Sequence, residues 1–270
     1  MKGARERLTG RREREGKPGL PSRAMRVLAL DFDGVISDSA REAFSVALRT
    51  YSSLRPRSRL GESEELYRGF VELMPLGNRA EDYGVALAAL EERAVIADQA
   101  AYDSFYRRQD QEQLRVFHER FYGIRTVWAE QDPEGWRRML SPFPGVLEIL
   151  HRRASQVTLA IATAKDRLSV GRLLRDYGID SLFRADLVLD KETGVSKRSH
   201  LEHLQQSLMV PFDAITFVDD KVSHLDEAAD LGVRCGLAAW GYNGRREWEA
   251  ALRAGHLVLH LEDLEGQLFG

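Results

Sequence analysis

Short apolar runs alternate with amphipathic stretches along the chain, most regularly in its second half. Apolar runs bounded by polar or turn residues predict strands at 26–30, 157–162, 185–189, 214–218, 233–238 and 256–259. Helical spacing of apolar residues predicts helices at 167–177, 199–208, 223–231 and 245–254. Strands that alternate with helices of this length are typical of a parallel sheet. The continuously apolar strands also indicate a sheet covered on both faces. We therefore expect an α/β fold.

The segment between the first two predicted strands has a different pattern. Stretches such as "REAFSVALRTY", "EELYRGFVELM" and "LRVFHERFYGI" repeat apolar residues at helical spacing. The two prolines of "SPFPG", residues 141–145, indicate a linker back to the α/β pattern. We expect residues 25–38 and 141–270 to form a parallel α/β core domain. Residues 39–140 are expected to form a helical domain inserted after the first strand.

The composition of residues 1–24 differs from that of the rest. This segment has eight Lys or Arg residues, three Glu residues and few apolar ones, so we expect a disordered basic tail. An arm that binds nucleic acid is the alternative, but the formal net charge of the whole chain is −3. Cys235 is the one cysteine, so no internal disulfide can form. No apolar run reaches the ~20 residues of a membrane span. We expect a cytoplasmic protein without a membrane partner.

Two pairs of aspartates stand where predicted strands end. The first strand runs into Asp31 and Asp33, and the strand at 214–218 runs into Asp219 and Asp220. The carboxyl ends of parallel strands lie at one edge of a sheet, where such folds bind ligands. Carboxylates that converge there repel one another unless a cation binds. An oxygen-only site of this kind suits Mg²⁺, which we expect as the cofactor.

Two further polar residues are expected at the same edge. Thr163 follows the strand at 157–162, and Lys197 leads into a predicted helix after the strand at 185–189. A hydroxyl and an ammonium group are suitable donors to a phosphate. Lys191 is a competing candidate for the lysine, although Lys197 lies directly ahead of the helix. Each motif alone is also compatible with an ordinary turn or surface residue, but their joint occurrence at strand ends favours a phosphate site.

These motifs resemble those of the haloacid dehalogenase superfamily. Motif one is "DFDGVISDS", motif two is "IATAK", motif three is Lys197 and motif four is "FVDD". The resemblance extends over residues 26–264, and "PFPGVLEIL", "HLDEAADLGV" and "AAWGY" are similar to the phosphatase branch with a helical, C1-type cap, as in phosphoglycolate phosphatase-like proteins. It implies a Rossmann-like α/β core with a cap, here residues 39–140, inserted after the first strand.

The resemblance also implies a mechanism and a set of site residues. Asp31 would attack phosphorus and form an aspartyl-phosphate, and Asp33 would protonate the leaving group and then activate water. Thr163 and Lys197 would stabilise charge on the phosphoryl group during transfer. The implied phosphate-binding residues are Phe32, Asp33, Thr163, Ala164 and Lys197. The implied Mg²⁺ ligands are Asp31, the backbone carbonyl of Asp33, and Asp220, with Asp219 either a direct ligand or one layer further out.

Two details of the motifs refine the resemblance. Dehalogenases of the superfamily lack an acid two residues after the nucleophile, so Asp33 favours phosphoryl transfer over dehalogenation. Many relatives have a glycine before the metal-binding aspartate of motif four, and an acid or Asn four residues after it. Here Asp219 replaces the glycine and His224 replaces the later residue. The sequence leaves open which of Asp219 and Asp220 touches the metal.

The expected function is Mg²⁺-dependent hydrolysis of a small phosphate monoester, so the expected partner is a small phosphorylated metabolite. The cap stretch "PLGNRAEDYG" offers Asn78, Arg79 and Tyr83 as candidate substrate-specificity residues. Two other functions stay open. One is a sugar-phosphate mutase of the same fold, and the other is a catalytically silent scaffold or nucleic-acid-binding protein that uses the basic tail. The expected oligomeric state is a monomer or a homodimer.

Overall fold

The computed structural model describes residues 26–77, 79–194 and 196–269. Its body is a six-stranded parallel sheet in the order β5-β4-β1-β6-β7-β8. The strands are β1 (Val27–Leu30), β4 (Thr158–Ala162), β5 (Val188–Leu189), β6 (Ile215–Asp219), β7 (Arg234–Ala238) and β8 (Leu257–Leu259). Because β1 lies between β4 and β6, the carboxyl ends of these three strands are adjacent.

Alternating residues of the central strand explain how helices cover both faces of the sheet. Leu28 and Leu30 pack into one hydrophobic cluster, and Val27 and Ala29 pack into another. Helices α7, α8 and α12 contribute to the first cluster, and helices α9, α10 and α11 contribute to the second. These helices are α7 (Val146–Arg153), α8 (Arg167–Asp176), α9 (Lys197–Leu208), α10 (Val222–Ala229), α11 (Arg245–Arg253) and α12 (Leu264–Phe269).

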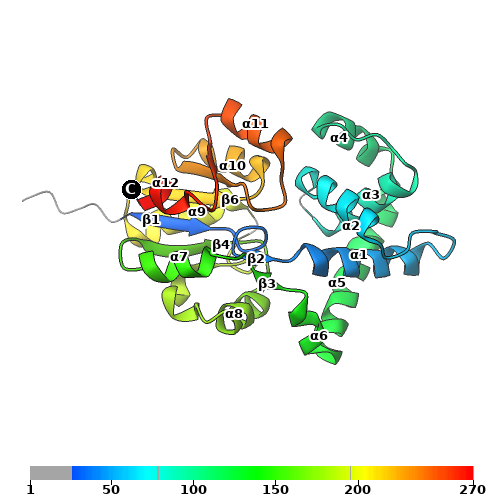
Figure 1. Cartoon of the computed structure of the whole chain (residues 1–270), viewed down its shortest axis with the longest axis horizontal. Coiled ribbons are helices and arrows are strands. Elements are labelled where there is room, and N and C mark those ends of the chain that lie inside the picture. The colour runs from blue at the N-terminus through cyan, green and yellow to red at the C-terminus, as the bar shows by residue number, and fades with distance from the viewer. Residues whose placement is uncertain (1–25, 78, 195, 270) are drawn as a thin grey trace, which may run out of the picture.

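The chain between β1 and β4 forms a helical cap beside the body (Figure 1). Its helices are α1 (Ala40–Leu54), α2 (Glu64–Leu73), α3 (Ala80–Glu91), α4 (Gln99–Arg107), α5 (Gln111–Gln131) and α6 (Pro133–Arg138). Helices α1 and α3 pack against the long α5, and apolar side chains of the cap form a third hydrophobic cluster. A short antiparallel ribbon, β2 (Ser37–Asp38) and β3 (Ser141–Pro142), joins the cap to the body.

The predicted α/β class, with a parallel sheet and a helical cap after the first strand, is confirmed. The strand predicted at 185–189 is only partly extended, because Ala185–Leu187 forms a 3-10 turn before β5. The predicted linker at 141–145 contains β3, which pairs with β2. Helices α7 and α12 and the ribbon were not predicted from the sequence, since such short elements show little periodicity.

No helix within residues 26–77, 79–194 and 196–269 is long and apolar enough to cross a membrane. The predicted basic tail, residues 1–24, lies outside the described residues. The same is true of Asn78, one of the three candidate specificity residues.

Candidate active site

Asp31 and Lys197 meet at the carboxyl edge of the sheet. Asp31 follows β1, and its backbone N–H donates to the Val218 carbonyl oxygen at 2.9 Å. Ser196 caps the N-terminus of α9, so the helix begins at Lys197. The Lys197 ammonium lies 2.8 Å from Asp31 Oδ1 and 3.1 Å from Asp219 Oδ2. Burial lowers the pKa of Lys197, but these two carboxylates outweigh it and raise the pKa above its usual value. Lys197 is therefore a buried, charged bridge between the ends of β1 and β6.

The adjacent aspartates at the end of β6 have opposite electrostatic environments. Asp219 is fully buried, and His224 Nδ1 lies 3.0 Å from its Oδ2. Burial raises the pKa of Asp219, but His224 and Lys197 outweigh it and lower the pKa. Burial and the neighbouring Asp219 carboxylate raise the pKa of Asp220 to about 8. Within the described part of the chain, no cationic side chain is within ion-pair distance of Asp220. Asp220 is therefore the carboxylate that still needs a cation.

Two glycines and a tyrosine make room for Asp220 and hold it in place. Gly34 has φ of +82°, and a Cβ there would lie 2.4 Å from the Asp220 carboxylate carbon. A Cβ on Gly241 would lie 2.4 Å from Asp220 Cβ. The Tyr242 N–H donates to Asp220 Oδ2 at 3.1 Å, and the Tyr242 hydroxyl accepts from the Ala40 N–H at 2.9 Å. Tyr242 thus connects Asp220 to the first helix of the cap.

Asp33 has different cation partners from Asp31. Lys165, in the loop after β4, donates to both carboxylate oxygens of Asp33, at 2.9 and 3.1 Å. Burial raises the pKa of Asp33, but the Lys165 ammonium and the Arg125 guanidinium outweigh it and lower the pKa. Arg125 belongs to α5 of the cap, where its Nε lies 2.6 Å from Glu42 of α1. The electrostatic environment of Asp33 therefore includes a residue of the cap.

A cavity of about 140 Å³ lies between the edge of the sheet and the cap. Its cap side includes Arg79, Tyr83, Phe121, Tyr122 and Arg125. Two lysines of the body reach the cap at the margin of the cavity. Lys221 donates to the Gly77 carbonyl oxygen, and the Lys191 ammonium lies 5.5 Å from the centre of the Tyr122 ring. The cavity is thus bounded by body and cap together.

Most of the predicted site residues line this cavity. They are Asp31, Asp33, Arg79, Tyr83, Thr163, Ala164, Lys197 and Asp220. The phosphate-binding role expected of Phe32 concerns its backbone N–H, and its buried ring packs into the core, where it stacks on Tyr177 with centroids 6.3 Å apart. Of the two candidate lysines, Lys197 contacts Asp31, whereas Lys191 lies at the margin.

Several residues that line the cavity are outside the predicted site, and four of them were described above. These four are Arg125, Lys165, His224 and Tyr242. The sequence holds a signal for Lys165, which lies two residues after Thr163 in the same strand-end motif. His224 and Tyr242 also follow strand ends closely. Arg125 has no such signal, because the direction of an arginine on a cap helix depends on how the helix packs.

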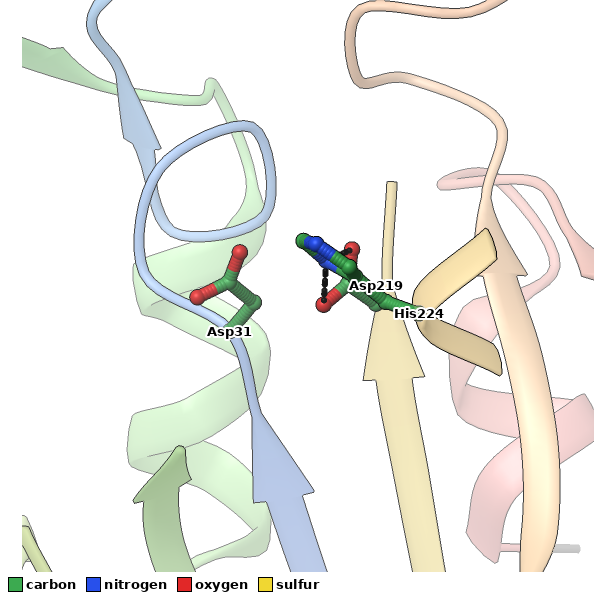
Figure 2. A group of neighbouring side chains, drawn as sticks. All are labelled: Asp31, Asp219 and His224. Atoms are coloured by element: carbon green, nitrogen blue, oxygen red, sulfur yellow. Dashed lines mark hydrogen bonds and ion pairs between the residues drawn. The ribbon is translucent and has the colours of Figure 1, made fainter. Parts of the chain in front are cut away.

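The carboxylates at the sheet edge fit a divalent cation. In the described part of the chain, Asp31, Asp219 and His224 each offer one ligand atom, and these atoms lie within 4.8 Å of one another (Figure 2). Asp220 adds a buried carboxylate without a cation partner. When ionised, three buried carboxylates beside one ammonium group carry a net negative charge that a divalent cation would neutralise. Carboxylate oxygens suit both Mg²⁺ and Mn²⁺.

Comparison with known proteins gives matches to one family model and to curated relatives. The family model described as haloacid dehalogenase-like hydrolase matches residues 25–232. Proteins named Tyrosine-protein kinase PtkA from Mycobacterium tuberculosis and Mycobacterium bovis are 31% identical to this chain over 124 residues. That match covers 44% of this chain and 41% of the relative, so the chain spans about two fifths of the length of these relatives.

Solved structures share the architecture of both body and cap. A haloacid dehalogenase-like hydrolase from Streptococcus pneumoniae has a TM-score of 0.63 at 14% identity, covering 91% of this chain and 98% of its own. A predicted phosphoglycolate phosphatase from Haemophilus somnus has a TM-score of 0.60 at 17% identity, covering 90% and 97%. At these identities the likeness concerns the fold. With a family model that covers most of its length, the chain belongs to the haloacid dehalogenase-like hydrolase family, as its motifs indicated.

Proposed function

We propose that this chain is a Mg²⁺-dependent phosphatase that hydrolyses a small phosphate monoester through a phosphorylated Asp31. The observation that carries the proposal is that Asp31 and Asp33 line one cavity but pair with separate cations, Lys197 and Lys165. Two carboxylates that share a site but not an environment can take different roles in one reaction. Membership in a hydrolase family supports the same reaction class.

In the proposed reaction, a carboxylate oxygen of Asp31 attacks phosphorus while the bond from phosphorus to the ester oxygen breaks. Asp33, in its protonated form at this step, donates its proton to that oxygen as it leaves. Asp33 then accepts a proton from a water molecule, whose oxygen attacks the phosphorus of the aspartyl-phosphate. Inorganic phosphate leaves and the Asp31 carboxylate is regenerated. Lys197 and the Thr163 hydroxyl donate to the phosphoryl oxygens, on which charge is spread in the transition state.

The metal ligands in this proposal are Asp31, Asp220 and the backbone carbonyl oxygen of Asp33. A bound Mg²⁺ supplies positive charge to the phosphoryl oxygens. Asp219, which Lys197 and His224 contact at the end of β6, borders the same site and offers it a further carboxylate oxygen. Gly34, Gly241 and Tyr242 hold Asp220, as described above.

The cap, proposed as residues 39–140, would keep bulk water from the reacting groups and select the substrate. Arg79 and Tyr83 line its side of the cavity, where the non-reacting part of a substrate would lie. A small cavity between body and cap supports a small phosphorylated metabolite as the substrate.

A second candidate is transfer of the phosphoryl group to an acceptor hydroxyl instead of water. The match to proteins named as tyrosine-protein kinases favours it, because an aspartyl-phosphate can react with any nucleophile that reaches it. A sugar-phosphate mutase would be another such transferase. Product analysis separates these candidates. Hydrolysis releases free phosphate, a mutase forms an isomer without free phosphate, and a kinase leaves the phosphoryl group on its acceptor.

A phosphate-release screen tests the proposal. The full chain would be assayed with Mg²⁺ on an aryl phosphate and on a panel of metabolite phosphates, beside Asp31→Asn. We expect release by the wild-type protein and none above background by the variant, with both showing the same circular dichroism and unfolding midpoint. Substantial release by Asp31→Asn, or none by the wild type on any substrate, would contradict the proposal.

A further inference from the structure

We propose that His224 is a ligand of the metal site, and that the site therefore binds Mn²⁺ more tightly than Mg²⁺. The inference rests on the proposed function, because it assumes a divalent cation beside Asp31. It goes beyond that function because it concerns a residue outside the oxygen ligands that the motifs imply. The position and the chemistry of the imidazole carry the argument.

The start of α10 brings His224 over the end of β6. Only two residues separate the strand from the helix, and His224 lies in the first helical turn. Its side chain is 20% exposed and lines the cavity. Figure 2 shows Asp219 of β6 and His224 of α10 in contact, on the side of the site that faces Asp31, which follows β1. The imidazole is therefore inside the carboxylate cluster and open to the cavity.

The spacing of the three side chains is close to that of ligands around one ion. His224 Nδ1 lies 3.0 and 3.1 Å from the two carboxylate oxygens of Asp219. One ligand atom each from Asp31, Asp219 and His224 lie within 4.8 Å of one another. Atoms bound to one cation at about 2.1 Å are separated by roughly 3 to 4 Å. A small shift on ion binding would bring the three atoms to this separation.

The charge of the cluster also favours a neutral ligand at this position. When all three carboxyls are ionised, as they would be around a cation, Asp31, Asp219 and Asp220 with the Lys197 ammonium carry three negative charges and one positive charge. One divalent cation would balance them. A further carboxylate at residue 224 would leave the cluster negative, against the approach of a phosphate. A neutral imidazole adds a donor atom without adding charge.

The chemistry of imidazole determines which cation binds more tightly when His224 is a ligand. Mg²⁺ strongly prefers oxygen ligands, whereas imidazole nitrogen is a good ligand for transition metals. Mn²⁺ accepts carboxylate oxygen as well as nitrogen, so it can use the whole cluster. Among divalent first-row ions, Mn²⁺ has the lowest affinity for a given site of this kind. Tighter binding of Mn²⁺ than of Mg²⁺ is thus a stricter test of the nitrogen ligand than tighter binding of any other ion in this series.

The other role open to His224 is to hold Asp219 through a hydrogen bond, without touching an ion. An asparagine amide can place a donor near the position of Nδ1 but has no ring nitrogen. His224→Asn therefore keeps the hydrogen bond and removes the nitrogen ligand, while His224→Asp offers oxygen instead. His151→Asn is the matched control, because His151 is exposed on α7 and is not a residue of the cavity wall.

Mn²⁺ binding to the full chain is measured by electron paramagnetic resonance, and Mg²⁺ binding by competition with it. We expect the wild type and His151→Asn to bind Mn²⁺ at least about tenfold more tightly than Mg²⁺, and pulsed spectra to show coupling of bound Mn²⁺ to nitrogen. His224→Asn should lose the nitrogen coupling and about tenfold or more of the Mn²⁺ affinity, with a smaller loss for Mg²⁺. His224→Asp should bring the two affinities closer together.

The ligand role of His224 is overturned if wild-type spectra show no nitrogen coupling, or if His224→Asn binds Mn²⁺ as tightly as the wild type. Wild-type phosphate release with Mg²⁺ is measured on the same preparation. If the wild type releases phosphate but His224 shows no ligand role, only the ligand role is rejected and the proposed function stands. If the wild type binds neither ion and releases no phosphate, the proposed function falls with it.

Discussion

The floor and the roof of the cavity hold their charges in different ways. The floor consists of Asp31, Asp33, Thr163, Lys197 and Asp220 at the sheet edge, and the roof consists of Arg79, Tyr83, Phe121, Tyr122 and Arg125 of the cap. On the floor, the Lys197 ammonium is shared between carboxylates from two strands. On the roof, Arg125 is paired with Glu42 of a neighbouring helix.

The difference follows from the elements that carry the two sets. Backbone hydrogen bonds of a parallel sheet fix the ends of its strands relative to one another, so side chains that follow them meet in a set arrangement. The position of a roof side chain depends on helix packing and on how the cap sits on the body. The floor is therefore suited to the chemical step, and the roof to choosing among substrates.

Removing the shared ammonium should disrupt the floor and produce the largest effect. Lys197→Met leaves Asp31 and Asp219 without their common cation and the phosphoryl group without a donor. We expect kcat for phosphate release to fall by roughly a hundredfold to a thousandfold. Lys191→Met, at the exposed margin, should change kcat by less than about threefold, because exposed charges are screened. An equal loss of kcat in Lys197→Met and Lys191→Met would contradict the distinction between a lysine of the floor and a lysine at the margin of the cavity.

Removing the Arg125 guanidinium from the roof should lower the stability of the cap. Arg125→Met leaves the Glu42 carboxylate, which is 3% exposed, as a buried charge without its cation, with the Trp136 indole N–H as its remaining hydrogen-bond donor. We expect the free energy of unfolding to fall by roughly 3 kcal/mol, as measured by denaturant titration. The double variant Glu42→Gln with Arg125→Met removes both charges and should recover most of the loss. No destabilisation by the single variant would show that the pair does not hold the roof together.

A smaller effect is expected in the loop that precedes Lys197. Asp190 is buried and accepts from Arg167 Nε at 2.7 Å. Burial raises the pKa of Asp190, but hydrogen bonds from Arg167 and Thr193 outweigh it and lower the pKa. Such a carboxyl stabilises the fold above its unfolded pKa of about 4, and this contribution is lost as the pH falls through the folded pKa.

Asp190→Asn should therefore lower the free energy of unfolding by about 1 kcal/mol near neutral pH, since Arg167 is largely exposed and its charge is screened. The difference from the wild type should shrink as the pH falls below about 4. Urea titrations at neutral and acidic pH measure it. A difference that stays constant with pH would mean that the Asp190 charge contributes nothing to stability.

The floor could be predicted from the sequence because its residues follow apolar strands directly. The runs that became β1 and β6 end at Asp31 and Asp219, and parallel strands place such ends side by side. Lys197 could be found in the same way, as the residue at which a helix begins. The sequence did not tell which of Asp219 and Asp220 touches the metal. In the structure, Lys197 of α9 and His224 of α10 both contact Asp219, which distinguishes it from Asp220.

The roof could not be predicted in the same detail. Apolar spacing indicated helices across 39–140, but periodicity does not tell which helices pack together or which side faces the body. Arg125 and Glu42 are 83 residues apart, and neither belongs to a recognisable motif. Tyr83 lies within the stretch singled out from its polar character, yet its place in the cavity wall depends on the packing of α3.

The most direct test of the account asks whether Asp31 carries the phosphoryl group. In Asp33→Asn, an aryl phosphate with a good leaving group can still phosphorylate Asp31, because that leaving group needs no proton, whereas hydrolysis lacks its base. Acid quenching followed by peptide mass spectrometry should then find one phosphoryl group on Asp31, and none in the Asp31→Asn and Asp33→Asn double variant. Phosphate release by the wild type, with the phosphoryl group found on another residue or on no residue, would contradict the account.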